Sequence, residues 1–361
     1  METLAAVLDT PDQRLTVERL QLVDVPEGCL LIRTTASGIC GTDLHVVQGT
    51  MESKHGFPVV LGHEATGIVE AVGSKVQGFA EGNRVVVTAI TPCLSCERCL
   101  AGTPHLCDRS WDVVVTHPLR RGQGQPVHAF FGIGSLSDFV IVPATAAVSL
   151  PDDIPWPVAA LLACGGQTGL GSAFNTAPVT RGNRVIIFGC GPVGLCVVMA
   201  CRFLGASQIV AVDVNESRLG MARELGASPC LNPFSADPVE ETLDSIPDGV
   251  DVAFECVGKV ETIEQAFQTL ARGGKLVVIG APPEGSRFSI DPLELLSDRK
   301  IAGSFAGSVN PQRDYPKWFD LYRKGQLPLD RLIGRRYALD DVNEAFDDMA
   351  SGRTIKPIVA F

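Results

Sequence analysis

The stretch VIIFGCGPVGLCVVMACRFLGASQIVAVD, residues 185–213, has the order strand, glycine turn, helix, strand and terminal acid. Val185–Phe188 is an apolar run of strand length, and Leu195–Leu204 has the length and composition of a helix. Between them, Gly189-Cys-Gly-Pro-Val-Gly194 fits the Gly-x-Gly-x-x-Gly pattern, which carries meaning only between a strand and a helix. This stretch therefore predicts a dinucleotide-binding unit.

Each part of the pattern has a physical task. Gly189 permits the tight turn, Gly191 lets backbone amides approach a pyrophosphate, and Gly194 lets the helix pack closely on the strand. The helix N-terminus offers unpaired N–H groups to that pyrophosphate. Asp213 follows Gly194 by nineteen residues, close to the spacing of about twenty expected for an acid that binds the ribose hydroxyls. Its carboxylate would repel a 2′-phosphate, so the sequence favours NAD over NADP.

Two different patterns flank this stretch. Residues 1–90 alternate short apolar runs with glycine and proline, which predicts a small Greek-key barrel or sandwich. From Asn175 onward strands alternate with helices, which predicts a parallel, doubly wound sheet. Strands are expected at 5–8, 15–19, 29–33, 67–72, 84–87, 185–188, 209–212, 250–254, 275–279 and 356–361, and helices at 193–204, 216–225, 262–270, 315–324 and 339–350. We expect one domain of residues 1–164 and 305–361, to which the last strand returns, and a second of residues 165–304.

Composition narrows the classes of partner. The chain has 361 residues, of which 45% are hydrophobic and 20% charged, as in ordinary globular enzymes. A formal net charge of −11 argues against nucleic acid or an anionic membrane surface as partner. No apolar run reaches about 18 residues, and Met1–Leu4 lacks the basic start of a signal peptide. We therefore expect a cytoplasmic protein.

Twelve cysteines require an explanation. In a reducing compartment, clustered cysteines are better explained as metal ligands or catalysts than as disulfides. Six are scattered in apolar surroundings and are expected to be small buried hydrophobic residues: Cys29, Cys190, Cys196, Cys201, Cys230 and Cys256.

Four others form a compact set, Cys93-Leu-Ser-Cys96-Glu-Arg-Cys99 followed by Cys107. Zinc binds four tetrahedral thiolates at about 2.3 Å, and a short loop can wrap one ion in this way. A closed shell of four thiolates leaves no position for a substrate. The spacing therefore predicts a structural zinc site.

The last two cysteines belong to a dispersed group, Cys40, His63 and Cys164. Two thiolates and one imidazole would leave the fourth position of a zinc ion open, which is the ligand set known from alcohol dehydrogenase. Each residue also has a structural alternative, since a buried histidine or cysteine is common in cores. The four-cysteine loop and the dinucleotide pattern favour a catalytic metal site.

These motifs, taken in this order, resemble the zinc-dependent medium-chain alcohol dehydrogenases over essentially the whole chain. The resemblance rests on Gly62-His63-Glu64, on Cys40-Gly-Thr-Asp-Leu-His45, on the four-cysteine lobe and on Gly189–Gly194 with Asp213. It implies a GroES-like β-barrel catalytic domain, a Rossmann domain, and two zinc ions per subunit together with NAD. It implies Cys40, His63 and Cys164 as the ligands of the catalytic zinc.

Further roles follow from the resemblance. Asp43 and Glu64 would be carboxylates behind the zinc ligands, in keeping with the need of a ligating imidazole for an acceptor on its other nitrogen. Such a metal lowers the pKa of an alcohol hydroxyl, and the nicotinamide accepts the hydride. Thr42 would take the proton and pass it through the nicotinamide ribose to His45, which titrates in a suitable range.

Cofactor contacts are also implied by the resemblance. Thr168 and Val193 match positions against the nicotinamide ring, and Arg218 matches a basic position near the adenosine ribose. Gly41 stands where many members carry a basic residue over the pyrophosphate, which leaves Lys356 to hold that pyrophosphate alone.

The family's substrate pocket falls on apolar residues, two of them small where bulkier ones are common, and this predicts a roomy, dry pocket for bulky or alicyclic alcohols. These positions are Met51, Ala89, Phe130, Phe131 and Ala281. Arg120 and Arg121 could instead favour a charged substrate such as a glutathione adduct, although a solvated turn is the better explanation.

Three rival functions remain to be tested. A glutathione-dependent formaldehyde dehydrogenase would need the thiol for NAD reduction, and a polyol dehydrogenase would often replace Cys164 by a carboxylate. A non-catalytic zinc or nucleotide-binding protein would have no need of an open metal site. In all cases a homodimer or homotetramer is expected, because residues 288–303 resemble the family's sheet edge that pairs with a second subunit.

Overall fold

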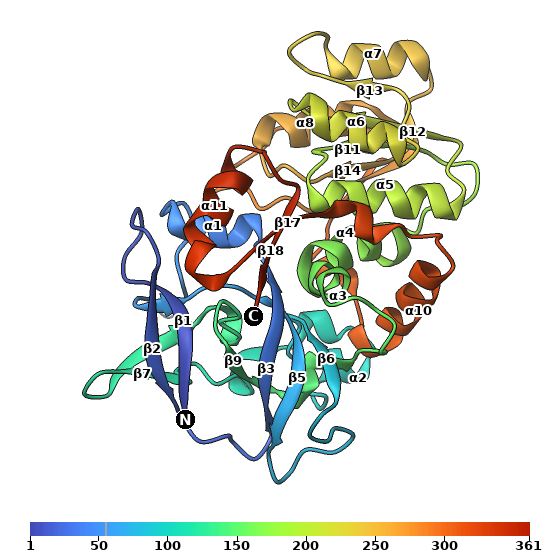
Figure 1. Cartoon of the computed structure of the whole chain (residues 1–361). Coiled ribbons are helices and arrows are strands. Elements are labelled where there is room, and N and C mark those ends of the chain that lie inside the picture. The colour runs from blue at the N-terminus through green and yellow to red at the C-terminus, as the bar shows by residue number, and fades with distance from the viewer. Residues whose placement is uncertain (55) are drawn as a thin grey trace. The chain divides into compact units, whose positions relative to one another are not determined.

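The computed structural model describes residues 1–54 and 56–361, which form two compact units (Figure 1). Unit 1 comprises Met1–Cys164, Asn310–Arg323 and Leu329–Phe361, and unit 2 comprises Gly165–Val309 and Lys324–Pro328. Residues 305–309 and 324–328, which the sequence assigned to the first domain, belong to unit 2. One reason is that Gly307 packs directly against the helix that contains Gly171, where an added Cβ on Gly171 would lie 2.4 Å from the Gly307 carbonyl oxygen.

Unit 1 contains a closed barrel in the order β1-β2-β7-β8-β4. Strand β1 is buried over Ala5–Leu8 and β4 over its whole length, and the buried side chains of the barrel form a core with Val7, Leu20 and Val127. The bounds are β1 Glu2–Leu8, β2 Thr16–Leu22, β4 Val59–Val60, β7 Leu119–Arg121 and β8 Gln125–Ala129.

A second sheet of unit 1 has the order β10-β6-β5-β3-β18-β17, with β9 paired to β3. Strand β18 lies antiparallel to β3, so the C-terminal strand does return to the first domain as predicted. The sequence expected one barrel or sandwich, and the structure has a barrel together with this sheet. The bounds are β3 Cys29–Gly38, β5 Glu64–Val72, β6 Arg84–Val87, β9 Phe139–Pro143, β10 Ala147–Ser149, β17 Ile333–Tyr337 and β18 Lys356–Ala360.

Unit 2 is built on a six-stranded sheet in the order β13-β12-β11-β14-β15-β16, and all its neighbouring strands are parallel. Counted within the unit, this is the order 3-2-1-4-5-6 of the doubly wound dinucleotide fold. The predicted parallel sheet is therefore confirmed. The bounds are β11 Arg184–Phe188, β12 Gln208–Val212, β13 Cys230–Leu231, β14 Val250–Glu255, β15 Leu270–Val278 and β16 Lys300–Gly303.

The helices follow the amphipathic stretches of the sequence. Those of unit 1 are α1 Gly41–Val47, α2 Glu97–Leu100, α3 Trp156–Leu161, α10 Pro311–Arg323 and α11 Val342–Ala350. Those of unit 2 are α4 Gln167–Gly171, α5 Pro192–Leu204, α6 Glu216–Glu224, α7 Pro238–Ser245, α8 Val260–Gln268 and α9 Pro292–Leu295. Two π-helical turns, Leu162–Gly166 and Ser172–Thr176, flank α4.

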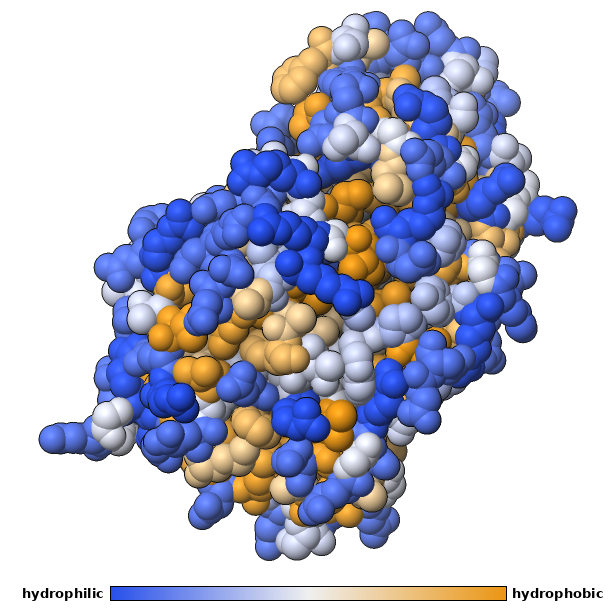
Figure 2. Space-filling view, in the orientation of Figure 1, coloured by the Kyte–Doolittle hydropathy of each residue, from blue (hydrophilic) through white to orange (hydrophobic). Residues whose placement is uncertain are grey.

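Hydrophilic residues cover much of the face shown in Figure 2, and apolar residues lie between them in separate groups. Among the described residues, the longest apolar helices fall short of the length and hydropathy that a membrane-spanning helix requires.

Candidate metal centres and dinucleotide site

Three segments of unit 1 bring Cys40, His63 and Cys164 together. Cys40 directly precedes α1, and His63 directly precedes β5. Gly62 turns the chain into His63 with a φ of +86°, and a Cβ there would lie 2.5 Å from the Ser135 hydroxyl, so only glycine fits. Cys164 lies in the π-helical turn Leu162–Gly166, a local geometry that is often found at functional sites.

The donor atoms of this cluster have the spacing that zinc requires. The two sulfurs of Cys40 and Cys164 are 4.0 Å apart, and His63 Nε2 lies 3.3 Å from the Cys164 sulfur. Ligands of a tetrahedral zinc at its usual bond lengths are separated by about 3.5–3.8 Å. The residues therefore fit a zinc ion without rearrangement of the backbone.

Asp43 lies behind this cluster with no exposed surface. Its Oδ1 accepts from the backbone N–H of Gly62 at 2.9 Å and lies 3.2 Å from Nδ1 of His63. Its Oδ2 accepts from the backbone N–H of Cys40 at 2.9 Å. One carboxylate thus fixes two of the three donor segments and holds the His63 imidazole so that Nε2 faces the sulfurs.

The Glu64 carboxylate lies nearer to the donor atoms of Cys40, His63 and Cys164 than the sequence suggested. Its carboxylate belongs to the same group of donor atoms, all within 4.8 Å of one another. It also forms an ion pair with Lys356, and both side chains are at most 1% exposed. Burial raises the pKa of Glu64 to about 7, against the opposing effect of the Lys356 ammonium. Glu64 is therefore a fourth candidate donor as well as a carboxylate behind the ligands.

Lys356 has partners within unit 1 that the sequence did not predict. Its Nζ donates to the carbonyl oxygen of Ile39 at 3.0 Å and pairs with Glu64. The ammonium is therefore paired with a counter-charge inside unit 1, and its contact with a pyrophosphate stays a prediction. Gly38 makes room for this pair, because a Cβ there would lie 1.9 Å from a Glu64 oxygen.

Electrostatics in the cluster favour thiolate character at Cys40. A hydrogen bond from Cys164 lowers the pKa of Cys40, while the reciprocal contact and burial raise the pKa of Cys164. Burial opposes the charged form of His63, but the Asp43 carboxylate raises its pKa overall. A bound cation would complete this set by replacing the remaining thiol proton.

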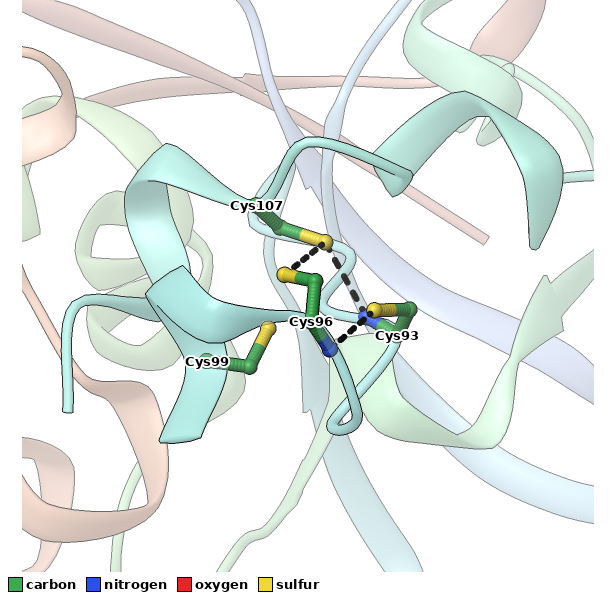
Figure 3. A group of neighbouring side chains, drawn as sticks. All are labelled: Cys93, Cys96, Cys99 and Cys107. Carbon is green, nitrogen blue, oxygen red and sulfur yellow. Dashed lines mark hydrogen bonds between the residues drawn. The ribbon is translucent and has the colours of Figure 1, made fainter. Parts of the chain in front are cut away.

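The four-cysteine lobe forms a second donor cluster, also within unit 1. Figure 3 shows the sulfurs of Cys93, Cys96, Cys99 and Cys107 around a common centre. The Cys96 and Cys107 sulfurs are 3.8 Å apart, close to the separation of about 3.8 Å for two thiolates on one zinc. Backbone N–H groups of Cys93 and Cys96 donate to Cys107 and Cys93 sulfurs at 3.2 and 3.3 Å. The donor chemistry fits the closed zinc site expected from the spacing.

The proposed proton-relay residues share one face of α1. Thr42 and His45 are three positions apart and both half-buried. The Thr42 hydroxyl lies 3.6 Å from the Cys40 sulfur, so this end of the helix borders the donor side chains Cys40, His63 and Cys164.

The glycine turn of unit 2 has the geometry that its sequence requires. Gly189 has a φ of +89°, and a Cβ on Gly194 would lie 1.8 Å from the Gly189 carbonyl oxygen. A Cβ on Gly191 would meet nothing within 4 Å, which leaves open space in front of the N-terminus of α5. This opening and the uncapped N–H groups fit the pyrophosphate of a dinucleotide.

Asp213 lies at the carboxyl end of β12 and is 7% exposed. It accepts from the backbone N–H of Cys190 at 2.7 Å and of Asn215 at 2.8 Å, so it is fixed against the glycine turn. Arg218 is half-buried in the first turn of α6. Burial raises the pKa of Cys190, and the Arg218 guanidinium opposes this shift only in part. Thr168 on α4 and Val193 on α5 lie on helices that pack together through Gly169, whose Cβ would come within 2.3 Å of the Val193 carbonyl oxygen.

Three of the five predicted pocket residues line one pocket in unit 1. Met51, Phe130 and Phe131 line it together with Glu52, Ser53, Lys54, Trp111 and Ala129. The His63 ring contacts the rings of Phe130 and Phe131 at centroid distances of 5.8 and 5.1 Å. Ala89 is half-buried after β6 beside another part of the core, and Ala281 is an exposed residue of unit 2.

Sequence reasoning missed Lys54 and Trp111 as pocket residues. Lys54 Nζ lies 3.8 Å from the centroid of the Trp111 ring, and both side chains border the pocket. The two residues are far apart in the chain, and no motif joins them. Only the tertiary structure could reveal the contact.

The family model for the alcohol dehydrogenase GroES-like domain matches residues 26–152, and the model for zinc-binding dehydrogenases matches residues 192–324. An S-(hydroxymethyl)glutathione dehydrogenase from Haemophilus influenzae is 32% identical over 100% of this chain and 98% of its own length.

Solved structures agree with these matches. Benzyl alcohol dehydrogenase from Acinetobacter calcoaceticus has a TM-score of 0.93 and 32% identity, covering 100% of this chain and 99% of that one. An alcohol dehydrogenase zinc-binding domain protein from Burkholderia ambifaria has a TM-score of 0.95 and 33% identity with the same coverage. The fold, the two donor clusters and these matches define the class of this protein: it is an oxidoreductase that uses zinc and a nicotinamide cofactor. The chain belongs to the zinc-dependent medium-chain alcohol dehydrogenase family, and the resemblance seen in the sequence is confirmed.

Proposed function

We propose that this protein is an NAD-dependent alcohol dehydrogenase that converts bulky or aromatic alcohols to aldehydes or ketones, reversibly and with release of one proton. The observation that carries the proposal is the cluster of two thiols and one imidazole beside an aromatic wall. Cys40, His63 and Cys164 provide the donors, and the His63 ring touches Phe130 and Phe131, which line a pocket.

In this proposal Cys40, His63 and Cys164 hold a zinc ion, and Cys93, Cys96, Cys99 and Cys107 hold a second, structural one. When bound, the first zinc acts as a Lewis acid on the alcohol oxygen, and NAD accepts the hydride. The protein's own residues orient these groups. Asp43 keeps the proton of His63 on Nδ1, so that Nε2 is free to act as a ligand.

The proton of the alcohol needs a path to solvent. Thr42 can accept it at Oγ1, because a hydroxyl both accepts and donates. His45, one turn further along α1 and half-buried, can take up the relayed proton and release it. We propose this order for the relay, with Thr42 at the metal cluster and His45 at the solvent end.

NAD is proposed over NADP because of Asp213. Its carboxylate is held at the end of β12 by two backbone N–H groups and retains acceptor capacity for ribose hydroxyls. A 2′-phosphate at the same place would meet a fixed negative charge. Arg218 lies nearby, so the preference is measurable as a ratio of affinities and need not be absolute.

A second candidate function is glutathione-dependent formaldehyde oxidation, favoured by the similarity to the Haemophilus influenzae enzyme. Such an adduct carries carboxylates that require cations. Arg121 is engaged with Asp9 and Glu18, and Arg120 donates to backbone carbonyl oxygens of His117 and Leu119. The arginines that the sequence offered for this role are therefore occupied in the fold.

We also propose that two or more copies associate through the edge of the unit 2 sheet. Strand β16 ends the strand order, and the neighbouring Leu293 and Leu296 are 70% and 81% exposed. Pairing of such an edge would cover its unpaired backbone groups and these leucines. Light scattering on a Leu296→Glu variant tests this, since a purely monomeric wild type would contradict it.

The test of the main proposal is NADH formation with zinc-loaded protein. The panel contains ethanol, cyclohexanol, benzyl alcohol, and formaldehyde with and without glutathione. We expect the highest kcat/KM with benzyl alcohol or cyclohexanol and none for Cys40→Ala. Preference for ethanol, or strict dependence on glutathione, would overturn the proposed substrate class, and no turnover at all would overturn the enzymatic function.

A further inference from the structure

The exposure of the lining residues differs between the two ends of the pocket beside His63, which we call the inner and the outer end. Ala129 and Phe130 are buried, Met51 and Phe131 are half-buried, and Lys54 is exposed. The inner end is therefore formed by the aromatic rings that touch His63. The outer end is formed by Lys54 and the half-buried Trp111.

Trp111 and Lys54 contact each other at the outer end. The Lys54 ammonium lies 3.8 Å above the indole centroid, well within the distance of about 6 Å for a cation–π contact. Trp111 follows the four-cysteine lobe, whereas Lys54 follows α1, so the contact joins two separate segments. A lysine stem laid over an aromatic face also covers apolar surface. The pair therefore forms part of the pocket lining at its exposed end.

Backbone geometry fixes the other side of the pocket. Phe131 has a φ of +53°, a conformation that residues with side chains seldom adopt. This conformation directs its ring against His63, at 5.1 Å, and against Phe130, at 4.6 Å. The Phe131 side of the pocket is therefore held by its backbone conformation and by contacts with two neighbouring rings.

We propose that Trp111 is the residue that determines substrate length, and that Lys54 is a positioning residue that holds Trp111 in place. This inference rests on the proposed function and names its substrate class. Compact aromatic primary alcohols with one ring fit between Phe131 and Trp111. Longer aromatic alcohols and extended adducts such as S-(hydroxymethyl)glutathione collide with the Trp111 indole.

The test compares benzyl alcohol with 4-phenylbenzyl alcohol, two neutral alcohols with the same reacting group and different lengths. For Trp111→Leu we expect the ratio of kcat/KM, long over short, to rise about tenfold, mostly through KM for the longer alcohol. For Lys54→Met, which keeps the stem and removes the charge, we expect a rise of about two- to fivefold, in line with the strength of an exposed cation–π contact. Lys54→Arg should restore the wild-type ratio, because a guanidinium also stacks on indole.

Lys75→Met is the matched control, since Lys75 is an exposed lysine of the same unit paired with Glu27. It should leave the ratio unchanged. Tryptophan emission gives a readout independent of turnover: Lys54→Met should shift it, and the shift should be absent in a Trp111→Leu background. An unchanged substrate ratio in Trp111→Leu, or equal ratios for Lys54→Met and Lys54→Arg, would overturn this inference. Failure of the wild type to oxidise either alcohol would instead overturn the proposed function.

Discussion

Replacement of Asp43 by asparagine tests how the buried carboxylate supports the donor side chains Cys40 and His63. The carboxylate serves three donors: Oδ1 faces the N–H of Gly62 and Nδ1 of His63, and Oδ2 accepts from the N–H of Cys40. Asparagine has the same shape but only one acceptor atom. In either orientation its NH2 group faces at least one N–H donor, and that donor then loses its hydrogen-bond acceptor.

The size of the effect follows from burial. Asp43 has no exposed surface, so water cannot replace the lost acceptor. A buried donor left unpaired costs about 1–3 kcal/mol. Loss of the carboxylate behind a metal-ligating histidine typically weakens metal affinity about 10- to 100-fold, which is about 1.4–2.7 kcal/mol. The first cost applies to the free energy of unfolding and the second to zinc binding, so the two are measured separately.

The assay is competition for zinc with a chromophoric chelator, combined with zinc content by mass spectrometry. We expect Asp43→Asn to lose affinity at one site, to keep the zinc of the four-cysteine lobe, and to lose most activity. Asp348→Asn is the control: Asp348 is 7% exposed and accepts from Tyr337 and Arg353. It should lose stability but not zinc. Unchanged zinc affinity in Asp43→Asn would refute the reasoning.

Three further predictions concern the rest of the machinery. Gly194→Ala places a Cβ 1.8 Å from a backbone oxygen, so unfolding temperature and NADH affinity, read by fluorescence titration, should both fall; Gly220→Ala, whose Cβ meets nothing within 4 Å, should stabilise by up to about 1 kcal/mol. Cys99→Ser should lower the zinc content by one ion per chain and lower the unfolding temperature, and retention of both zinc ions would count against a structural site. Lys356→Met leaves the buried Glu64 carboxylate unpaired and should lower the free energy of unfolding, measured with denaturant, by about 3–5 kcal/mol. Adding Glu64→Gln should recover most of this loss. If Lys356→Met alone were as stable as the wild type, the ion pair would not be formed.

Local spacing explains what the sequence could predict. The glycine turn and the four-cysteine lobe each lie within a short segment, so the residue order alone limits the geometry. The parallel sheet followed from alternating strands and helices in the same way. The contacts of Lys54 with Trp111 and of Glu64 with Lys356 join distant segments, and no local pattern contains them.

Element boundaries show the same limit on a smaller scale. The sequence predicted a helix to Leu270 and a strand from Lys275, but α8 ends at Gln268 and β15 already begins at Leu270. The sequence could not show this because Gly273 and Gly274 disfavour a strand by themselves. Pairing with β14 overrides that preference: Leu270 lies opposite Val250, and a register shift before Val252 accommodates the glycines.

Strand register also explains how the side chains of Cys40, His63 and Glu64 come together. Gly38 at the end of β3 lies opposite Glu64 at the start of β5, and on its other side opposite Ile358 of β18. This register places Cys40, two residues beyond β3, next to His63, one residue before β5. A slip of one residue would turn Glu64 to the opposite face of the sheet and separate it from Lys356. The buried ion pair and the lack of a side chain at Gly38 therefore favour the register that brings these two candidate zinc ligands together.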